Sequence, residues 1–318
     1  MKRFKNPKGA TLAFLIAALL SAAAIAEEVW KKPDPHTLPD GASKDEVLYG
    51  ETLIRRTYSV IGPEVANPAM RYAGNNLACG SCHLDGGRQR LGLSYVGVYD
   101  AYPANMAREN EMRTLTQRIN GCMERSMNGR ALPDESAEIK AMIAYIRFLS
   151  ADAPEGVNGR STPQLALMDR AADPAKGAEV FDLYCAACHG ADGQGMRNGK
   201  AGDAGGYLYP PLWGPDSFND GAGMHRLITS ARFIHANMPL GTTFESPLLT
   251  EEEAFDVAAY INSQPRPEKG GLDRDFPDRS RKPVDAPFPP YDDDFSLEQH
   301  RLGPFKPIIE DREKRKEG

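Results

Sequence analysis

The sequence predicts an all-α protein with two tandem domains of the same kind and irregular extensions at both ends. The motif Cys-x-x-Cys-His occurs twice, as CGSCH at 79–83 and as CAACH at 185–189. Each copy follows a segment with helical periodicity and precedes an amphipathic helix, so the chain contains an internal repeat. Strand-like alternation of apolar and polar residues is scarce. These three observations indicate one helical domain around each motif.

Residues 1–26 have the features of a secretory signal peptide. The basic stretch MKRFKNPKG precedes the apolar run ATLAFLIAALLSAAAIA, which ends in a small-x-small cleavage pattern at 24–26. We therefore expect export to the periplasm and no membrane span after cleavage. An uncleaved anchor is the alternative, because the apolar run is nearly long enough to cross a bilayer.

The exported chain would be acidic. The sequence of 318 residues has a formal net charge of −6, and residues 1–26 contain four basic residues and no acidic one, so cleavage leaves −10. This charge argues against nucleic acid as a partner and against a polybasic membrane-binding face.

The repeated motif is the attachment sequence of c-type haem. Its two cysteines bond the porphyrin vinyl groups, and the adjacent histidine becomes the proximal ligand of the iron. A zinc site or a thioredoxin-like pair is the alternative, but neither explains a histidine after each second cysteine. The sequence therefore predicts two covalently bound haem c groups. Their attachment residues are Cys79, Cys82, His83, Cys185, Cys188 and His189.

The N-terminal domain is predicted at 27–155. The stretch DEVLYGETLIRRTYSVIG at 45–62 provides the helix before the haem motif. The stretch DESAEIKAMIAYIRFLS at 134–150 has apolar residues near i, i+3 and i+4 spacing and provides the terminal helix. A linker containing Gly, Pro and Ser follows at 156–172.

The C-terminal domain is predicted at 173–265. Its first helix lies in DPAKGAEVFDLYCAACHG, and its terminal helix begins at a capping box formed by Thr250 and Glu253. Both copies therefore have the order helix, haem motif, distal-ligand loop and terminal helix, which is typical of a cytochrome c domain. Residues 266–318, rich in Pro, Asp, Arg and Lys, are predicted as an irregular extension that lies over the domains, with a disordered tail as the alternative.

Met238 is the predicted sixth ligand of the second iron. It precedes Pro239, which favours an extended loop, and it lies 22 residues before Tyr260. His225, His235 and Met224 are the alternatives. Methionine–histidine ligation raises the potential of the iron, which suits an electron exit.

The sixth ligand of the first iron is less clear from spacing. Cys122 lies 23 residues before Tyr145 and Met123 lies 22 before it, which slightly favours Met123. A spare thiol in an oxidising compartment, however, invites oxidation and mispairing, whereas a thiolate bound to ferric iron is protected. A buried, inert Cys122 beside a methionine ligand stays open as the alternative.

The neighbours of Cys122 suggest an anionic substrate that reacts with a thiol. Arg118, Cys122 and Ser126 have i, i+4, i+8 spacing and share a helix face, with Arg125 close beside it. Residues 108–130 contain five arginines and three acidic residues. Arginine binds oxyanions through paired donors, and a nearby cation favours the thiolate. The alternative is that these arginines hold haem propionates.

The sequence resembles the dihaem thiosulfate dehydrogenase family of bacterial periplasmic c-type cytochromes. The matching stretches cover most of residues 30–310, and RINGCMERSMNGR is the most specific part. They are NNLACGSCHLDGG, LTQRINGCMERSMNGRALP, YPPLWGPDSFNDGAGM, IHANMPLG and QPRP. The resemblance implies His83 and Cys122 as axial ligands of one iron, and His189 and Met238 as those of the other.

The resemblance also implies a reaction. It would join two thiosulfate ions into tetrathionate, reversibly in principle, and pass two electrons through the haems to a small c-type cytochrome or a similar acceptor. The implied catalytic residues are Cys122, Arg108, Arg118 and Ser126. A dihaem peroxidase, a plain electron carrier and a relative of the sulfur-oxidising carrier complexes are the alternative functions.

Overall fold

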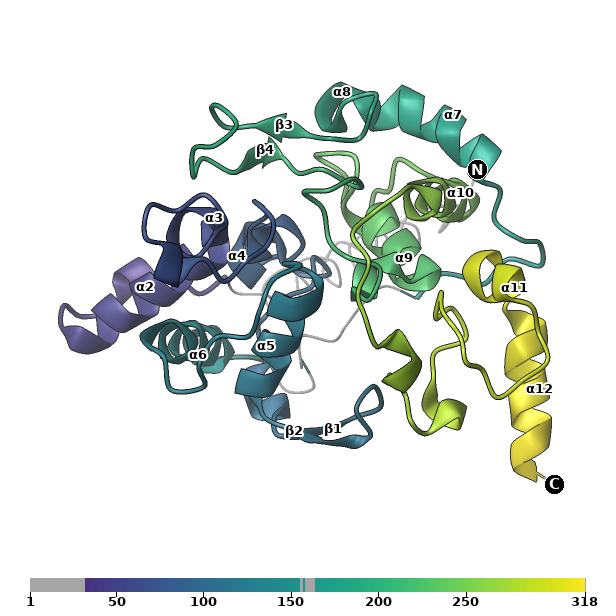
Figure 1. Cartoon of the computed structure of the whole chain (residues 1–318), viewed down its shortest axis with the longest axis horizontal. Coiled ribbons are helices and arrows are strands. Elements are labelled where there is room, and N and C mark those ends of the chain that lie inside the picture. The colour runs from purple at the N-terminus through teal and green to yellow at the C-terminus, as the bar shows by residue number, and fades with distance from the viewer. Residues whose placement is uncertain (1–31, 155–156, 158–163, 318) are drawn as a thin grey trace, which may run out of the picture.

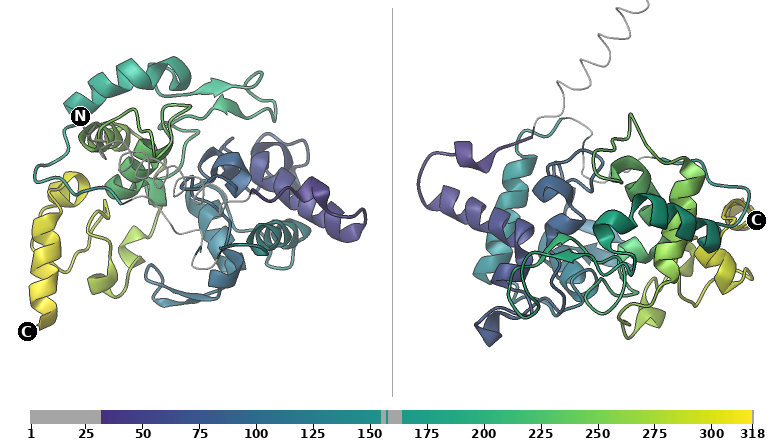
Figure 2. Two further views of the ribbon diagram at one scale, coloured as in Figure 1. Left: turned by 180° about the vertical axis from the view of Figure 1, so that it is seen from behind. Right: turned by 90° about the horizontal axis from the view of Figure 1, so that it is seen from above.

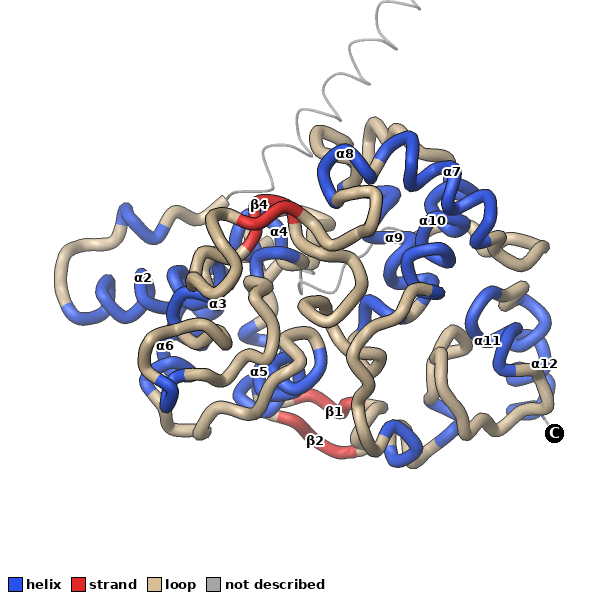
Figure 3. The backbone as a smooth tube through the Cα atoms, turned by 45° about the horizontal axis from the view of Figure 1, so that its top comes forward, coloured by secondary structure: helices blue, strands red, loops and turns tan. Residues whose placement is uncertain are grey.

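The computed structural model describes residues 32–154, 157 and 164–317. The signal peptide expected at 1–26 and part of the linker expected at 156–172 lie outside these residues. Within them, no helix has both the length and the apolar character needed to cross a membrane. Helices and loops make up nearly all of the described residues, and the strands among them form two short hairpins (Figure 3).

Two groups of helices lie side by side (Figure 1). The first contains α2 (Ala42–Arg55), α3 (Thr57–Val60), α4 (Leu84–Gly87), α5 (Leu115–Arg125) and α6 (Ala137–Ser150), with the hairpin β1 (Ala104–Met106) and β2 (Glu111–Arg113). The second contains α7 (Pro174–Tyr184), α8 (Ala186–His189), α9 (Leu227–Asn237) and α10 (Glu251–Ser263), with β3 (Met196–Arg197) and β4 (Tyr207–Tyr209). Short 3₁₀ turns lie at Pro35–Thr37, Pro68–Met70, Cys79–Ser81, Tyr99–Ala101, Gly223–His225, Leu272–Arg274 and Arg279–Arg281.

The same helix crossing builds both domains, because α2 crosses α6 in the first and α7 crosses α10 in the second. Each crossing contains a glycine that admits the backbone of the other helix. A Cβ atom on Gly50 would lie 2.0 Å from the carbonyl oxygen of Ala141, and one on Gly177 would lie 1.9 Å from that of Asp256. Each domain has its own buried core, with Tyr145 in the first and Phe181 and Phe255 in the second. The internal repeat in the sequence is therefore also a structural repeat.

Local sequence signals set the helix starts. The Thr250 hydroxyl accepts from the N–H of Glu253 while the Glu253 carboxylate accepts from the N–H of Thr250, so the predicted capping box is present. Thr114 and Gln117 form a second such box at the start of α5. Asp173 caps α7, with Pro174 in its first turn, where a missing N–H has no cost.

The C-terminal extension was expected to be irregular, but its last part is helical. It runs along the second domain and finishes in α11 (Leu297–Leu302) and α12 (Lys306–Glu317), as both views in Figure 2 show. Ile308 of α12 is fully buried against the second core together with Phe305. Part of the expected linker belongs to the same core, since Leu165 and Ala172 are buried in it.

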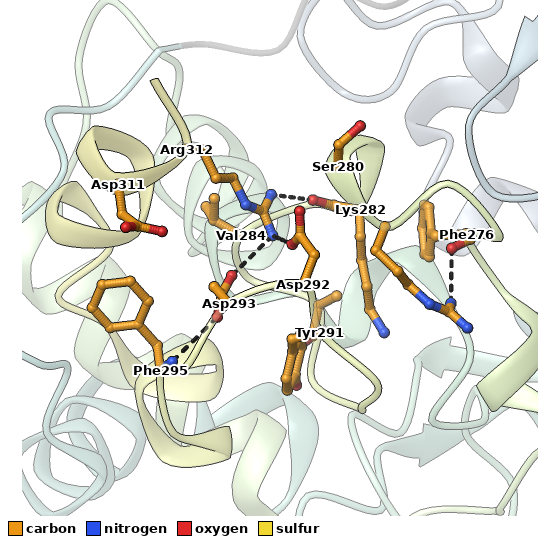
Figure 4. A network of polar contacts seen from close by, with 12 residues as sticks. Phe276, Ser280, Lys282, Val284, Tyr291, Asp292, Asp293, Phe295, Asp311 and Arg312 are labelled. Atoms are coloured by element: carbon orange, nitrogen blue, oxygen red, sulfur yellow. Dashed lines mark hydrogen bonds and ion pairs between the residues drawn. The ribbon is translucent and has the colours of Figure 1, made fainter. Parts of the chain in front are cut away.

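A polar network holds the extension together (Figure 4). The Lys282 ammonium, almost fully buried, donates to the carbonyl oxygens of Phe288 at 2.6 Å and Pro290 at 3.0 Å. The Arg312 guanidinium of α12 donates to the Lys282 carbonyl and lies 3.3 Å from the Asp293 carboxylate. These bonds satisfy buried polar groups, so this irregular segment forms a fixed structure.

Candidate active site

The first Cys-x-x-Cys-His motif borders a cavity of 440 Å³ in the N-terminal domain. This volume lies in the range of roughly 300–1,000 Å³ that is usual for cofactor and ligand sites. Cys79, Cys82 and His83 line it, as do Cys122 and Ser126. The second domain also contributes to the wall, through Gly223, Met224 and Thr229. The cavity therefore lies where the two domains meet.

The first haem motif is held in a fixed orientation. The buried Thr57 hydroxyl accepts from the N–H of Cys79 at 3.0 Å. The imidazole Nδ1 of His83 lies 2.5 Å from the Leu93 carbonyl oxygen, and its ring stacks on Tyr95 at 4.3 Å. Burial lowers the pKa of His83 to about 4, so the ring is neutral and leaves Nε2 for a metal. These features fit a histidine that ligates the iron of a bound haem.

The second motif repeats this arrangement. The His189 Nδ1 lies 2.8 Å from the Pro210 carbonyl oxygen, and burial lowers the pKa of His189. Burial, followed by the neighbouring Cys188, raises the pKa of Cys185 to about 11. Met238 directly follows α9 and packs, like Cys185, against the core of this domain. None of the five cysteines forms a disulfide, so four of them are available for thioether attachment of haem.

The alternative ligands of the second iron have different surroundings. Met224 lines the cavity of the first motif instead. Both ring nitrogens of His225 face carbonyl oxygens, at 2.9 Å from Asp220 and 3.3 Å from Asn262. His235 is buried in α9, where its Nδ1 has no hydrogen-bond partner among the described residues. The carbonyl contacts of His225 and the position of Met224 disfavour these two, and Met238 stays the predicted ligand of the second iron with His235 as its alternative.

Helix α5 brings the predicted catalytic residues to the cavity. Arg118 and Cys122 lie on it, and Ser126 is its C-cap residue. Arg108 reaches the same cavity from the loop between β1 and β2. Met123 also borders the cavity, but it is 1% exposed and packs within the first core. The structure thus brings all four predicted catalytic side chains together.

The cavity wall is strongly cationic. The charge of Cys122 is the largest cause that raises the pKa of Arg118, against the opposing effect of burial. Burial, followed by the positive charges of Arg125 and Arg118, lowers the pKa of Arg108 to about 10. Arg125 lines the cavity too. Three guanidinium groups beside one thiol suit the binding of an oxyanion that reacts with sulfur.

Two arginines of the same stretch have other roles. Arg113 pairs with Glu111 at 2.6 Å, and Arg130 lies 3.9 Å over the ring of Tyr72. Neither is among the residues that line the cavity. The local excess of positive charge in the sequence therefore overstates the number of arginines at the site.

Sequence reasoning did not place residues from distant segments at the site. Phe218 and Met224 line the smaller cavity that adjoins Cys122, and they come from the second domain. Asp275 reaches Arg125 from the C-terminal extension, at 2.8 Å. No local pattern in the sequence marks these residues, because their roles arise from contacts between segments far apart in the chain.

Two family models match the chain. The SoxA/TsdA cytochrome c domain matches residues 70–154, and the cytochrome c domain matches residues 174–265. These matches contain one Cys-x-x-Cys-His motif each. The chain therefore contains two cytochrome c domains in tandem, with two covalently bound haem c groups.

Curated relatives and a solved structure agree with these matches. The thiosulfate dehydrogenase of Allochromatium vinosum is 41% identical over 241 residues, which cover 74% of this chain and 83% of the relative. That of Stutzerimonas stutzeri is 38% identical over 244 residues, covering 76% and 74% respectively. Among solved structures, thiosulfate dehydrogenase (TsdBA) from Marichromatium purpuratum matches with a TM-score of 0.68 and 36% identity. That match covers 78% of this chain and 52% of the TsdBA chain, so this chain spans about half of that protein. This chain is therefore a c-type cytochrome oxidoreductase that belongs to the thiosulfate dehydrogenase family.

Proposed function

We propose that this protein joins two thiosulfate ions into tetrathionate and passes two electrons to a small c-type cytochrome or a similar acceptor. One observation supports this most directly. Cys122 lines the cavity of the first haem motif together with Arg108, Arg118 and Ser126. A thiol beside several guanidinium groups suits a sulfur oxyanion as substrate. A peroxidase or a plain electron carrier would have no use for this arrangement.

We assign His83 and Cys122 as the ligands of the first iron, and His189 and Met238 as those of the second. When bound, the two haems take up the two electrons, one each, and release them singly. The predicted signal peptide at 1–26 supports a periplasmic location, where a small cytochrome could serve as the acceptor.

Cys122 provides the covalent step. Its thiolate would first leave the iron. It then forms an S–S bond with the outer sulfur of the first thiosulfate, and this oxidation releases two electrons. A second thiosulfate then attacks the substrate-derived sulfur of the adduct. The bond to Cys122 breaks, tetrathionate leaves, and the thiolate is restored. No net proton is consumed or released, and the reverse sequence reduces tetrathionate.

The arginines make the meeting of two dianions possible. Two such ions repel each other strongly where little water screens them. Arg118 lies one helical turn before Cys122, and Ser126 lies one turn after it, so both can contact an anion bound to the Cys122 sulfur. Arg108 and Arg125 add positive charge on the same cavity. Fixed donors of this kind stabilise developing negative charge without reorganisation.

Anaerobic addition of thiosulfate to the oxidised, haem-loaded protein tests this function. We expect haem reduction and tetrathionate formation by the parent, and neither by Cys122→Ala. Met123→Leu is the matched control, because it changes the adjacent buried residue and conserves its volume, and it should react like the parent.

Each other outcome has a definite meaning. Equal reduction in the parent and in Cys122→Ala would refute the role of Cys122. Loss of reaction in Met123→Leu alone would favour Met123 as the functional ligand. If thiosulfate reduces neither protein, the reduced parent is then mixed with tetrathionate. Oxidation of its haems would assign the reverse reaction, whereas no oxidation would leave an electron carrier.

A further inference from the structure

The C-terminal extension places one carboxylate behind the cationic wall of the site. The Asp275 Oδ1 accepts from the Arg125 Nη2 at 2.8 Å, and its Oδ2 lies 3.7 Å from the Arg108 Nε. Both arginines line the cavity, whereas Asp275 is not among the residues that line it. We propose that Asp275 is a positioning residue, which holds Arg108 and Arg125 in place for the substrate anions. This inference rests on the proposed function.

The two contacts of Asp275 differ in strength. Its bond with Arg125 is short, charge-assisted and mostly shielded from water, since both side chains are about one-tenth exposed. Its distance to Arg108 is too long for a hydrogen bond, and the Arg108 Nε and the Asp275 Oδ2 have no other partner among the described residues. The carboxylate thus attracts Arg108 without occupying its donors, which remain available to a ligand in the cavity.

The backbone around Asp275 is fixed to the loop that contains Arg108. The N–H of Phe276 donates to the carbonyl oxygen of Arg108 at 2.7 Å. Phe276 has a φ of 57°, an unusual value for a bulky residue, and the Arg279 guanidinium donates to its carbonyl oxygen at 2.7 Å. This conformation persists because several bonds determine it, a pattern that is common at functional sites.

A second contact fixes the same end of this hairpin. The Arg281 guanidinium donates to the side-chain oxygens of Asn105 at 3.0 Å and Asn110 at 2.9 Å. These two residues flank Arg108 in the β1–β2 hairpin. The extension therefore holds the Asp275 carboxylate in place, and it also holds the β1–β2 loop that contains Arg108.

The negative charge of Asp275 offsets the repulsion among the arginines at the cavity. Arg108, Arg118 and Arg125 all lie at the cavity, and their mutual repulsion contributes to the lowered pKa of Arg108. Among the acidic groups, Asp275 most strongly raises the pKa of Arg108 and so opposes this shift. Without the carboxylate, the repulsion would drive the Arg108 and Arg125 guanidiniums apart. The net positive charge would rise, but the donors would no longer converge on one anion.

Asp275 also lies outside both matched domains, which end at 154 and 265. The two domains provide the haem motifs, Cys122 and the arginines, whereas the partner of the arginines comes from the extension. The active site is therefore incomplete without the segment that follows the second cytochrome c domain.

Asp275→Asn in the haem-loaded full chain tests this role. We expect KM for thiosulfate to rise about tenfold while kcat changes less than about threefold, because the variant removes one charge-assisted bond and keeps Cys122. In a Cys122→Ala background, the dissociation constant of thiosulfate, measured by calorimetry without turnover, should rise by a similar factor. Asp275→Glu keeps the charge and should restore most of the lost affinity.

Asp285→Asn is the matched control. Asp285 is a buried carboxylate of the same extension, and it pairs with Arg226 at 2.6 Å, but neither residue lines the cavity. This variant should leave KM and the dissociation constant unchanged. Equal effects of the two variants would show a merely structural role, and so would loss of folding in Asp275→Asn. Unchanged or tighter binding in Asp275→Asn would also refute the proposal.

The same experiment distinguishes failure of the positioning role of Asp275 from failure of the proposed thiosulfate reaction. If thiosulfate neither reacts with the parent nor binds to Cys122→Ala, the proposed function fails and the role of Asp275 fails with it. If the parent reacts and Asp275→Asn behaves like Asp285→Asn, the function stands and only the positioning role fails.

Discussion

Arg118 is the residue whose charge is most closely tied to Cys122, since the thiol is the largest cause of its raised pKa. We predict that Arg118→Gln lowers kcat/KM for thiosulfate by about 10²–10³, the usual effect of removing one donor to a developing charge. Arg118→Lys should recover only part of this loss, because lysine is a point charge without paired donors. Arg113→Gln is the control, since Arg113 does not line the cavity, and steady-state kinetics would measure all three. A loss in Arg113→Gln as large as that in Arg118→Gln would indicate a general effect of charge.

His225 should make the protein sensitive to acid. Burial, followed by the positive charge of Arg266, lowers the pKa of His225 from 6.5 to about 4. Between these two values the unfolded chain binds a proton that the folded chain does not, so stability falls as pH falls. Relative to His225→Gln, we predict that the parent loses up to about 3 kcal/mol of unfolding free energy from pH 6.5 to pH 4. Denaturant titrations at several pH values would test this, and a constant difference between the two proteins would contradict it.

At the residue scale, the sequence predicts which site residues lie together when they are separated by only a few helical turns. Arg118, Cys122 and Ser126 could be grouped because helical spacing alone places them on one face of α5. Arg108 came only from the family resemblance, since the loop between β1 and β2 has no periodicity from which its direction could be read. Asp275 could not be predicted, because it meets Arg125 across 150 positions of sequence.

At the scale of elements, the paired helix crossings make a prediction about both domains. A Cβ atom on Gly50 or Gly177 would lie 2.0 or 1.9 Å from a backbone oxygen of the facing helix, so the helices must move apart. We predict that Gly50→Ala and Gly177→Ala each destabilise the protein by at least 1–3 kcal/mol, as overpacking usually does. The haem-loaded proteins would be compared by chemical denaturation.

Gly270→Ala is the control for these two variants. Gly270 is exposed in the C-terminal extension, does not line the cavity, and a Cβ atom there would have nothing within 4 Å. The substitution should leave stability unchanged or raise it slightly, since alanine loses less conformational freedom on folding. If all three variants were equally stable, the crossings would not depend on glycine.

The elements also show why the extension was harder to predict than the domains. The helices α6, α7 and α10 have apolar faces and clear caps, so their sequences indicated them. Helix α12 is mostly charged, and Ile308 is the one fully buried side chain among its described residues. A helix held by so few apolar contacts has no periodic pattern, and the charged stretch therefore resembled an irregular segment or a disordered tail.

At the scale of the whole molecule, one carboxylate joins the two domains close to the first haem motif. The Asp216 Oδ1 accepts from the N–H of Asn76 at 2.9 Å, three positions before Cys79. Its Oδ2 accepts from the Arg197 guanidinium at 2.9 Å and from the Tyr207 hydroxyl at 2.7 Å. Asp216, Arg197 and Tyr207 belong to the second domain, so their bonds fix it to the first beside the active site.

We predict that Asp216→Ala weakens the coupling between the two domains. The variant leaves the N–H of Asn76 and the Arg197 guanidinium without their main partner, which should cost about 2–4 kcal/mol of the interaction between the domains. Asp203→Ala is the control, because the exposed Asp203 accepts only from the N–H groups of Lys200 and Gly205 in its own loop. Its effect should stay within the second domain.

Chemical unfolding of the haem-loaded protein would separate these cases, because the different ligands proposed for the two irons give each domain its own absorption signal. In the parent and in Asp203→Ala, we expect both signals to change together in one transition. In Asp216→Ala, the midpoints of the two signals should move apart in denaturant concentration, since each domain has a separate core and one polar link between them is lost. Other links remain, among them the bonds of Asn219 to Glu124 and of Asn237 to Leu91. Coincident transitions in Asp216→Ala would contradict the prediction and would mean that the remaining polar and apolar contacts suffice to couple the domains.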